Sequence, residues 1–178
     1  MTNPTSGHPA AGAAAGHWVL DPAHSSVRFR SKSVWNLITV KGEFGSLGGS
    51  GEVQPGGTAQ GTLTVQTASL DTNHGKRDTH LRSADFFHSE EHPELVFTAA
   101  SVTPVGTDEL DVAGELTVRG TTRPLNFTAR ITAADANAVT LEAEVAVHRA
   151  DFGMTWNQLG MIKGPTTVSI TARYQRES

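Results

Sequence analysis

A segment near the middle of the chain concentrates the side chains that could do chemistry. Arg77, Asp78 and His80 lie within a single helical turn's length of sequence. A histidine beside a carboxylate can carry out general acid–base catalysis. The same side chains can instead bind the head group of an anionic ligand, or hold the segment in place through an internal salt bridge. These alternatives predict a small-molecule enzyme, a binding protein or a structural connection.

A second charged group is expected to point inward. Arg149 continues the alternation of apolar residues that precedes it, so its side chain is predicted to face the interior. A buried guanidinium needs a carboxylate or a bound anion, and buried charges are usually paired. Asp78, Asp85 and Asp151 are the candidate carboxylates. The residues predicted to anchor either the segment or a ligand head group are Arg77, Asp78, His80, Arg149 and Asp151.

Histidines in the same segment raise the question of a metal site. The chain has histidine at positions 74, 80, 88 and 92 and glutamate at positions 90 and 91, and zinc favours such ligands. Their spacing matches no closed ligand set, and Pro93 argues against a helix that would bring His88 and His92 together. The sequence therefore predicts no metal site, and hydrated surface histidines are the preferred interpretation.

The rest of the chain consists of segments in which apolar and polar residues alternate. Ile38, Val40 and Phe44 share one face of their segment, and residues 109–119 alternate throughout. Strict alternation is typical of a half-buried strand. About eight or nine such strands, joined mostly by short turns, predict antiparallel pairing, and their length favours a barrel over a sandwich. The predicted fold is all-β: a single antiparallel up-and-down β-barrel with a short helix in the long connection near residues 75-87.

The interior of this barrel is predicted to be hollow. Its inward positions carry many glycines and alanines and few large aromatic residues, which favours a ligand-holding lumen over a filled interior. A filled barrel would instead indicate a structural or stress protein. The residues predicted to line the lumen are Phe29, Val40, Phe44, Leu63, Val65, Phe97, Leu116, Val118, Phe127 and Val145. The residues predicted to close its mouth are Leu81, Phe86, Phe87, Phe152, Met154 and Trp156. The apolar loop that continues beyond Trp156 is either part of this lid or a dimer surface.

Composition excludes several classes of protein. The net charge is −4 and no basic run occurs, which excludes a typical nucleic-acid-binding protein. The chain has no cysteine and no apolar run long enough for a transmembrane segment. Residues 1–16 are small and polar and lack the features of a signal peptide, so they are predicted to be a flexible N-terminal tail. The barrel domain is predicted to span residues 17–178, in a cytoplasmic protein.

Longer motifs carry a family resemblance. DPAHSSVRF, GEFGSLGGSGEV, RDTHLRSADFF, GELTVRGTTRPLNF and HRADFGM occur in this order. Together they resemble the YceI-like, polyisoprenoid-binding family over roughly Trp18 to Tyr174. The resemblance implies a lipocalin-like barrel, a homodimer, and a hydrophobic lumen that holds a prenyl chain or a similar amphiphile. It implies no secure catalytic activity and no cofactor apart from a bound isoprenoid or quinone-like lipid. The predicted function is non-catalytic binding, storage or transport of a polyisoprenoid, isoprenoid quinone or related lipid.

Overall fold

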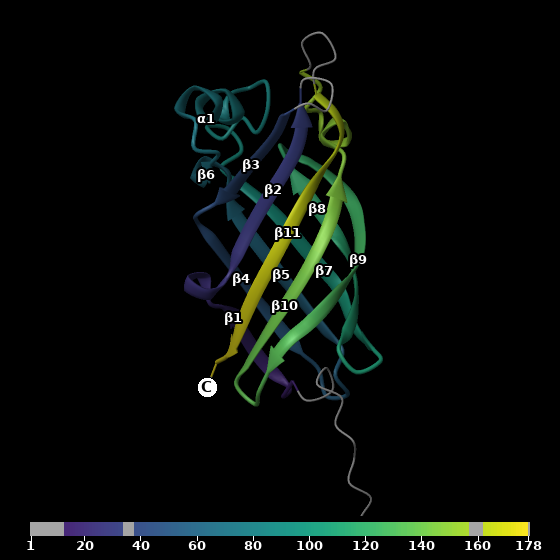
Figure 1. The fold of residues 1–178 in the computed structure, drawn as a ribbon. Coiled ribbons are helices and arrows are strands. Elements are labelled where there is room, and N and C mark those ends of the chain that lie inside the picture. The colour runs from purple at the N-terminus through teal and green to yellow at the C-terminus, as the bar shows by residue number, and fades with distance from the viewer. Residues whose placement is uncertain (1–12, 34–37, 157–161, 178) are drawn as a thin grey trace, which may run out of the picture.

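The chain folds into a closed antiparallel β-barrel. The computed structural model describes residues 13–33, 38–156 and 162–177. Among these residues, eight strands form a ring in the order β1-β4-β5-β7-β8-β9-β10-β11, which closes where β1 pairs with β11 (Figure 1). The predicted barrel is therefore confirmed. The strands of the ring are β1 Gly16–Leu20, β4 Leu47–Val53, β5 Ala59–Gln66, β7 Glu94–Val105, β8 Glu109–Val118, β9 Thr121–Ala134, β10 Ala138–Val147 and β11 Ile162–Arg176.

Three further strands extend one side of the barrel beyond the ring. They are β2 Ser26–Ser33, β3 Ile38–Phe44 and β6 Leu70–Asp71, which follow β11 in the order β11-β2-β3-β6. The described residues thus form more strand segments than the eight or nine predicted, because the chain bends twice. The 3-10 turn η1, Pro22–His24, separates β1 from β2, and Asp21 caps it by accepting a hydrogen bond from the Ala23 amide. A second bend at Gly45 separates β3 from β4, and its amide donates to the Ser69 carbonyl.

The long connection between β6 and β7 contains the predicted helix. Helix α1 spans Gly75–Arg82, and the His74 side chain caps its start by accepting a hydrogen bond from the Arg77 amide. The Arg82 guanidinium donates to the carbonyl oxygens of Ala68 and Leu70, at 3.0 and 2.9 Å. This contact fixes the end of α1 to the 3-10 turn η2, Thr67–Ser69, and to β6.

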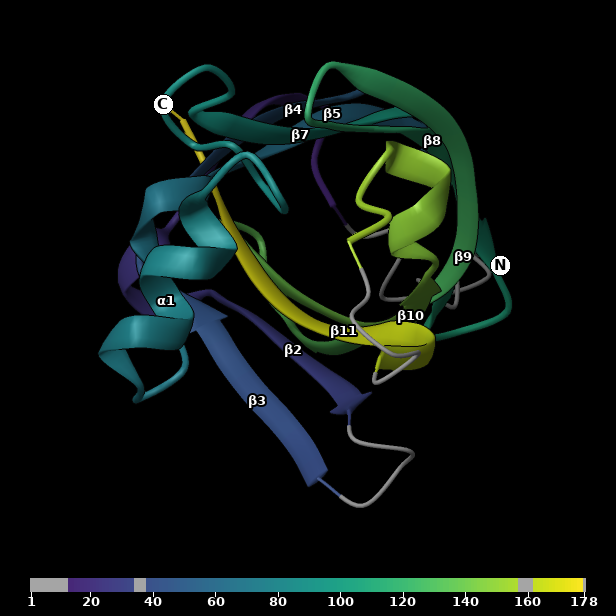
Figure 2. The same cartoon turned by 90° about the horizontal axis from the view of Figure 1, so that it is seen from above.

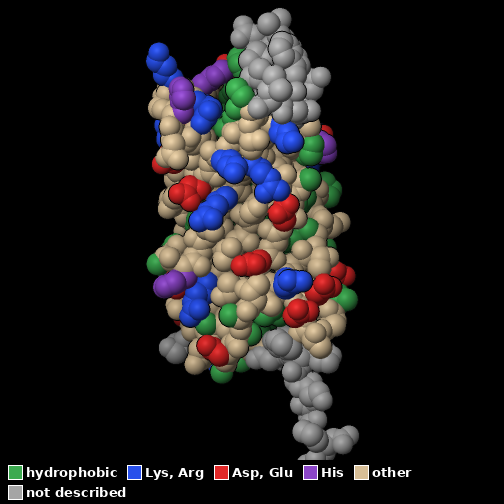
Figure 3. Space-filling model, in the orientation of Figure 1, with side chains coloured by type: hydrophobic (Ala, Val, Ile, Leu, Met, Phe, Trp, Pro, Cys, Tyr) green, Lys and Arg blue, Asp and Glu red, His purple; other side chains and the backbone are tan. Residues whose placement is uncertain are grey.

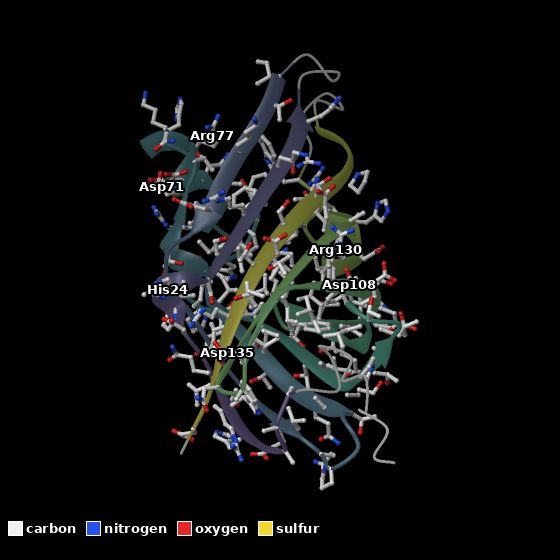
Figure 4. The ribbon with its side chains drawn as sticks, turned by 60° about the horizontal axis from the view of Figure 1, so that its bottom comes forward. His24, Asp71, Arg77, Asp108, Arg130 and Asp135 are labelled. Atoms are coloured by element: carbon white, nitrogen blue, oxygen red, sulfur yellow. The ribbon has the colours of Figure 1, made fainter. Side chains whose placement is uncertain are left out.

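The two ends of the barrel differ. We call the end that carries α1 and the 3-10 turn η3, Arg149–Phe152, the mouth end. Seen from above, α1 lies beside the ring of strands, and η3, in yellow-green, lies over the ring on the side opposite α1 (Figure 2). The other end carries the hairpin turns at residues 54–58, 106–108 and 135–137. Arg77 lies toward the mouth end and Asp135 toward the other end (Figure 4).

Inside and outside follow the alternation of the strands. The interior holds three clusters of buried apolar side chains. The outer surface carries basic and acidic side chains intermixed (Figure 3). Ion pairs join Arg28 of β2 to Glu43 of the neighbouring β3, and Arg30 of β2 to Glu144 of β10, across β11. Among the described residues, no helix is both long and apolar enough to cross a membrane.

Strand β1 is the first element of the barrel. Gly16 is the first residue of β1, and the Ala14 carbonyl accepts a hydrogen bond from the Trp18 indole at 3.0 Å. Most of the predicted N-terminal tail, residues 1–12, lies outside the described residues, as do residues 157–161 of the predicted lid loop.

Candidate functional site

The barrel encloses a cavity of about 520 Å³. This volume falls within the range of roughly 300–1,000 Å³ that is usual for small-molecule sites. The structure places all ten predicted lumen residues on the cavity wall. This cavity favours a ligand-holding lumen over the filled barrel that the sequence left open as an alternative.

Small residues have two different roles in the barrel. Ala99 and Ala143 line the cavity and leave it open. Gly42 and Gly114 serve close packing instead. A Cβ atom at Gly42 would lie 2.5 Å from Cζ of Phe29, and one at Gly114 would lie 2.2 Å from the Thr98 carbonyl oxygen. The sequence alone could not separate these roles, because both place a small residue at an inward position.

The predicted site residues did not include the part of the cavity wall that lies toward the end opposite the mouth. Trp18, Leu110 and Ile131 are buried and line the cavity together with the half-buried Tyr174. The alternation of β8, β9 and β11 places three of them inward, so the signal was present. The cavity wall therefore continues toward the end opposite the mouth.

Tyr174 supplies a polar group at this end of the cavity, opposite the mouth. Its hydroxyl donates a hydrogen bond to the Thr62 carbonyl oxygen at 3.0 Å. Burial raises the pKa of Tyr174 to about 12, because the phenolate would lose its hydration. The neutral phenol is therefore the form that the barrel stabilises.

Alkaline pH should destabilise the barrel through Tyr174. The folded-state pKa lies above the ordinary value of about 10, so this stabilisation is complete below about pH 10 and is lost as the pH rises toward about 12. The loss should reach roughly 2–3 kcal/mol in the free energy of unfolding. Because the chain has a single tyrosine, ultraviolet absorbance reports its ionisation directly. A midpoint near 10 in the folded protein would contradict the buried environment, and Tyr174→Phe should abolish this part of the pH dependence.

Two segments meet over the mouth of the cavity. Leu81, Phe86 and Phe87 come from α1 and the turn that follows it, whereas Phe152, Met154 and Trp156 come from η3 and the residues after it. All six line the cavity, and Phe86, Phe152 and Met154 are buried. The rings of Phe86 and Trp156 lie 5.5 Å apart, which joins the two segments. These contacts give the mouth an apolar cover.

The prediction that a carboxylate pairs with Arg149 was wrong. Its guanidinium donates two hydrogen bonds of 2.7 Å to the carbonyl oxygens of Met154 and Trp156, and the described residues contain no ion pair to it within 4.0 Å. Burial lowers the pKa of Arg149 from its ordinary value. Arg149 lines the cavity and braces the backbone of the mouth cover. Asp151, predicted as an anchor, is exposed and does not line the cavity.

The Arg77–Asp78–His80 group does not form one catalytic cluster. The buried Asp78 carboxylate accepts hydrogen bonds from the amide and the hydroxyl of Thr72, and Arg77 donates to the same residue. These contacts fix the first turn of α1 to Thr72, the residue that follows β6. Arg77 also lines the cavity, whereas Asp78 does not.

His80 lies at the mouth beside aromatic rings. Its Nε2 atom lies 2.8 Å from the Asp85 carboxylate, and its ring contacts Trp156 edge-on at a centroid distance of 4.5 Å. His80 also lines the cavity. The carboxylate beside His80 is therefore Asp85, which the sequence did not single out for this role.

Three potential metal ligands come together outside the cavity wall. Ring nitrogens of His88 and His92 and a carboxylate oxygen of Glu91 all lie within 4.8 Å of one another. The sequence predicted no metal site here because a helix through these positions is blocked. The structure brings them together in a single turn, which the hydrogen bonds from the Glu91 and His92 amides to the His88 carbonyl oxygen close.

Comparison with protein families and curated proteins gives a consistent result. The family model described as YceI-like domain matches residues 18–175 of this chain. Protein YceI of Escherichia coli O157:H7 is 48% identical over 69 residues, which are 39% of this chain and 36% of that protein. The matched stretch thus spans about a third of that relative's length. The UPF0312 protein VPA0850 of Vibrio parahaemolyticus serotype O3:K6 is 34% identical over 127 residues, 69% of this chain and 67% of that protein.

Solved structures share the fold. BcnA of Burkholderia cenocepacia superposes with a TM-score of 0.78 at 18% identity, over 86% of this chain and 98% of that chain. A polyisoprenoid binding domain from Saccharophagus degradans, implicated in plant cell wall breakdown, superposes with a TM-score of 0.71 at 18% identity. That match covers 90% of this chain and 98% of the other. At such identities the likeness establishes the lipocalin-like barrel fold.

Proposed function

We propose that this chain, which belongs to the family of YceI-like domains, binds a long apolar amphiphile in its barrel without transforming it. The observation that carries the proposal is the cavity of about 520 Å³, whose wall consists mainly of aliphatic and aromatic side chains. Each methylene group buried there contributes about 0.8 kcal/mol. Such a wall favours a hydrocarbon chain and disfavours a small charged solute.

The ligand class follows from the shape and the polar groups of the cavity. A polyisoprenoid, an isoprenoid quinone or a related lipid combines a long apolar chain with a small polar head. Arg77, His80 and Arg149 line the cavity near the mouth, and we assign the head group to this end. The relative from Saccharophagus degradans, named as a polyisoprenoid binding domain, supports the same ligand class.

The arrangement of the mouth favours binding over catalysis. A catalytic group built from Asp78, His80 and Arg149 would need these side chains to face a common substrate. Instead, Asp78 accepts hydrogen bonds from Thr72, and Arg149 donates to backbone carbonyls. We therefore retain storage or transport as the function and place no catalytic role on these residues.

A series of isoprenoid alcohols tests the proposal. Geraniol, farnesol and geranylgeraniol differ by one isoprene unit at a time and share one head group. Affinity should rise by at least about tenfold per unit until the cavity is full, because each unit adds several methylene equivalents. Isothermal titration calorimetry measures this dependence, with prenol as the short-chain control. Affinity independent of chain length would contradict lumen binding, and chemical alteration of the recovered alcohol would contradict a non-catalytic role.

A further inference from the structure

We propose that His88, Glu91 and His92 form a binding site for a divalent transition-metal ion, with zinc as the best-matched ion. This inference goes beyond the proposed ligand function and does not depend on it, because none of the three residues lines the cavity. The site lies in the turn between α1 and β7, in the same connection as the apolar residues Phe86 and Phe87.

The backbone of this turn is fixed from both sides. The His88 and Ser89 amides donate to the carbonyl oxygens of Ser83 and Arg82, both at 2.9 Å. On the other side, the Thr67 hydroxyl donates to the His92 carbonyl oxygen at 2.9 Å. Within the turn, the His92 amide donates to the His88 carbonyl oxygen at 2.8 Å. The two imidazoles are therefore carried by a backbone that does not have to be ordered by the metal.

The side chains already lie close to the spacing that a metal needs. A tetrahedral zinc ion with bonds of about 2.0–2.1 Å holds its ligand atoms about 3.3 Å apart. The His88 Nδ1 atom lies 3.2 Å from a carboxylate oxygen of Glu91. The rings of His88 and His92 have centroids 5.8 Å apart, and all three ligand atoms lie within 4.8 Å of one another. The Glu91 side chain is 71% exposed, so it can rotate to complete the site.

The kind of ligand selects the kind of metal. Two imidazole nitrogens and one carboxylate oxygen suit zinc and other late transition metals, whereas magnesium and calcium prefer an all-oxygen set. Three protein ligands leave a fourth position for water or another ligand.

Metal binding here would join the turn more firmly to the barrel. The His92 ring lies against the β8–β9 hairpin, where a Cβ atom at Gly120 would lie 3.1 Å from its Cε1 atom. A metal that holds His92 to His88 and Glu91 therefore restrains the turn over the end of β8. Phe86 and Phe87 belong to the same turn, so its restraint would extend to the cover of the cavity mouth.

The contrast with His17 supports the assignment. Both ring nitrogens of His17 face carboxylates, Nδ1 toward Glu52 and Nε2 toward Glu177 at 3.4 Å. Those carboxylates lie on opposite sides of one ring and cannot share an ion with it. The His88–Glu91–His92 group instead places three ligand atoms within 4.8 Å of one another.

Zinc titration of the full-length chain, purified without an oligohistidine tag, tests the proposal. Calorimetry should show one zinc ion per chain, and a hundredfold excess over Kd should raise the Tm by roughly 5–10 °C. His92→Ala and His88→Asn should each raise the zinc Kd by at least about 100-fold. This loss of affinity is larger than the one expected for a residue that only holds a metal ligand in place. Asparagine is chosen at position 88 because it tolerates the positive φ. His17→Ala is the matched control and should bind zinc as the wild type does.

Several results would overturn the site. Zinc binding that survives both His88→Asn and His92→Ala would locate the ion elsewhere, as would its loss in His17→Ala. Failure of the wild type to bind zinc at millimolar concentration would mean that these are hydrated surface histidines. Displacement of zinc by millimolar magnesium would contradict the nitrogen ligands. The Tm of each variant without metal shows that it is folded, so a loss of binding can be assigned to the missing ligand.

Discussion

Replacing Ala143 by tryptophan should expel an apolar ligand from the barrel while the barrel stays folded. Ala143 lies on β10 and lines the cavity. It pairs with Ile170 of the adjacent strand β11. An indole at this position would project into the cavity of about 520 Å³. If it displaces even four methylene groups of the ligand, it removes roughly 3 kcal/mol of binding free energy, about a hundredfold in Kd.

Ala146→Trp is the matched control for this experiment. Ala146 lies on the same strand but is exposed, so the same substitution adds its bulk outside the barrel. Exposed strand positions tolerate aromatic residues well. Both variants should keep the wild-type circular dichroism spectrum, and only Ala143→Trp should lose affinity for geranylgeraniol. Equal affinity in the two variants would show that the ligand does not occupy this part of the lumen.

Replacing Arg149 by methionine should loosen the cover of the cavity mouth. The substitution removes a charged donor from the carbonyl oxygens of Met154 and Trp156. Each hydrogen bond to a charged group contributes about 1.5–3 kcal/mol. Because water can partly solvate the two freed carbonyl groups, we expect the free energy of unfolding to fall by about 2–4 kcal/mol. The Trp156 ring would also lose its fixed position against His80 and Phe86. Ligand dissociation should therefore become faster, as measured by stopped-flow displacement.

A neighbouring arginine distinguishes this role from a general charge effect. Arg123 is exposed, and its Nε atom donates to the Asp151 carbonyl oxygen at 3.1 Å. Arg123→Met should change stability by less than about 0.5 kcal/mol, as surface substitutions usually do. Arg149→Lys should restore only part of the lost stability, because one ammonium group does not reproduce the guanidinium geometry. Wild-type dissociation rates and Tm in Arg149→Met would refute the bracing role.

The barrel and the wall of its lumen could be predicted because both depend on a period of two. Alternation alone placed Phe97, Leu116 and Phe127 inward, and all three line the cavity. Ile38 shows the limit of this reasoning. It shares a face with Val40 and Phe44 in sequence, yet it is 51% exposed. The bends at η1 and Gly45 carry β3 past the closed ring, and no local pattern indicated them.

The contacts at the mouth could not be predicted, because backbone atoms and turns form them. The alternation correctly directed Arg149 toward the cavity. Its partners could not be identified from the sequence, because every residue has a backbone carbonyl group and only the fold determines which ones lie within reach. His88 and His92 were separated in the sequence prediction because Pro93 blocks a helix. One isolated turn, closed by the hydrogen bond from the His92 amide to the His88 carbonyl oxygen, brings the two rings together without a longer helix. The homodimer and the cytoplasmic location stay predictions.

The central claim is that the barrel carries an apolar amphiphile, and mass spectrometry of an organic extract tests it most directly. The protein should be purified without detergent from a host that makes isoprenoids, beside a protein-free mock and the Ala143→Trp variant. We expect a polyprenyl or quinone species in about stoichiometric amount from the wild type and little of it from the variant. Extracts of wild type and Ala143→Trp that match the mock, from a host shown to contain such lipids, would contradict the claim.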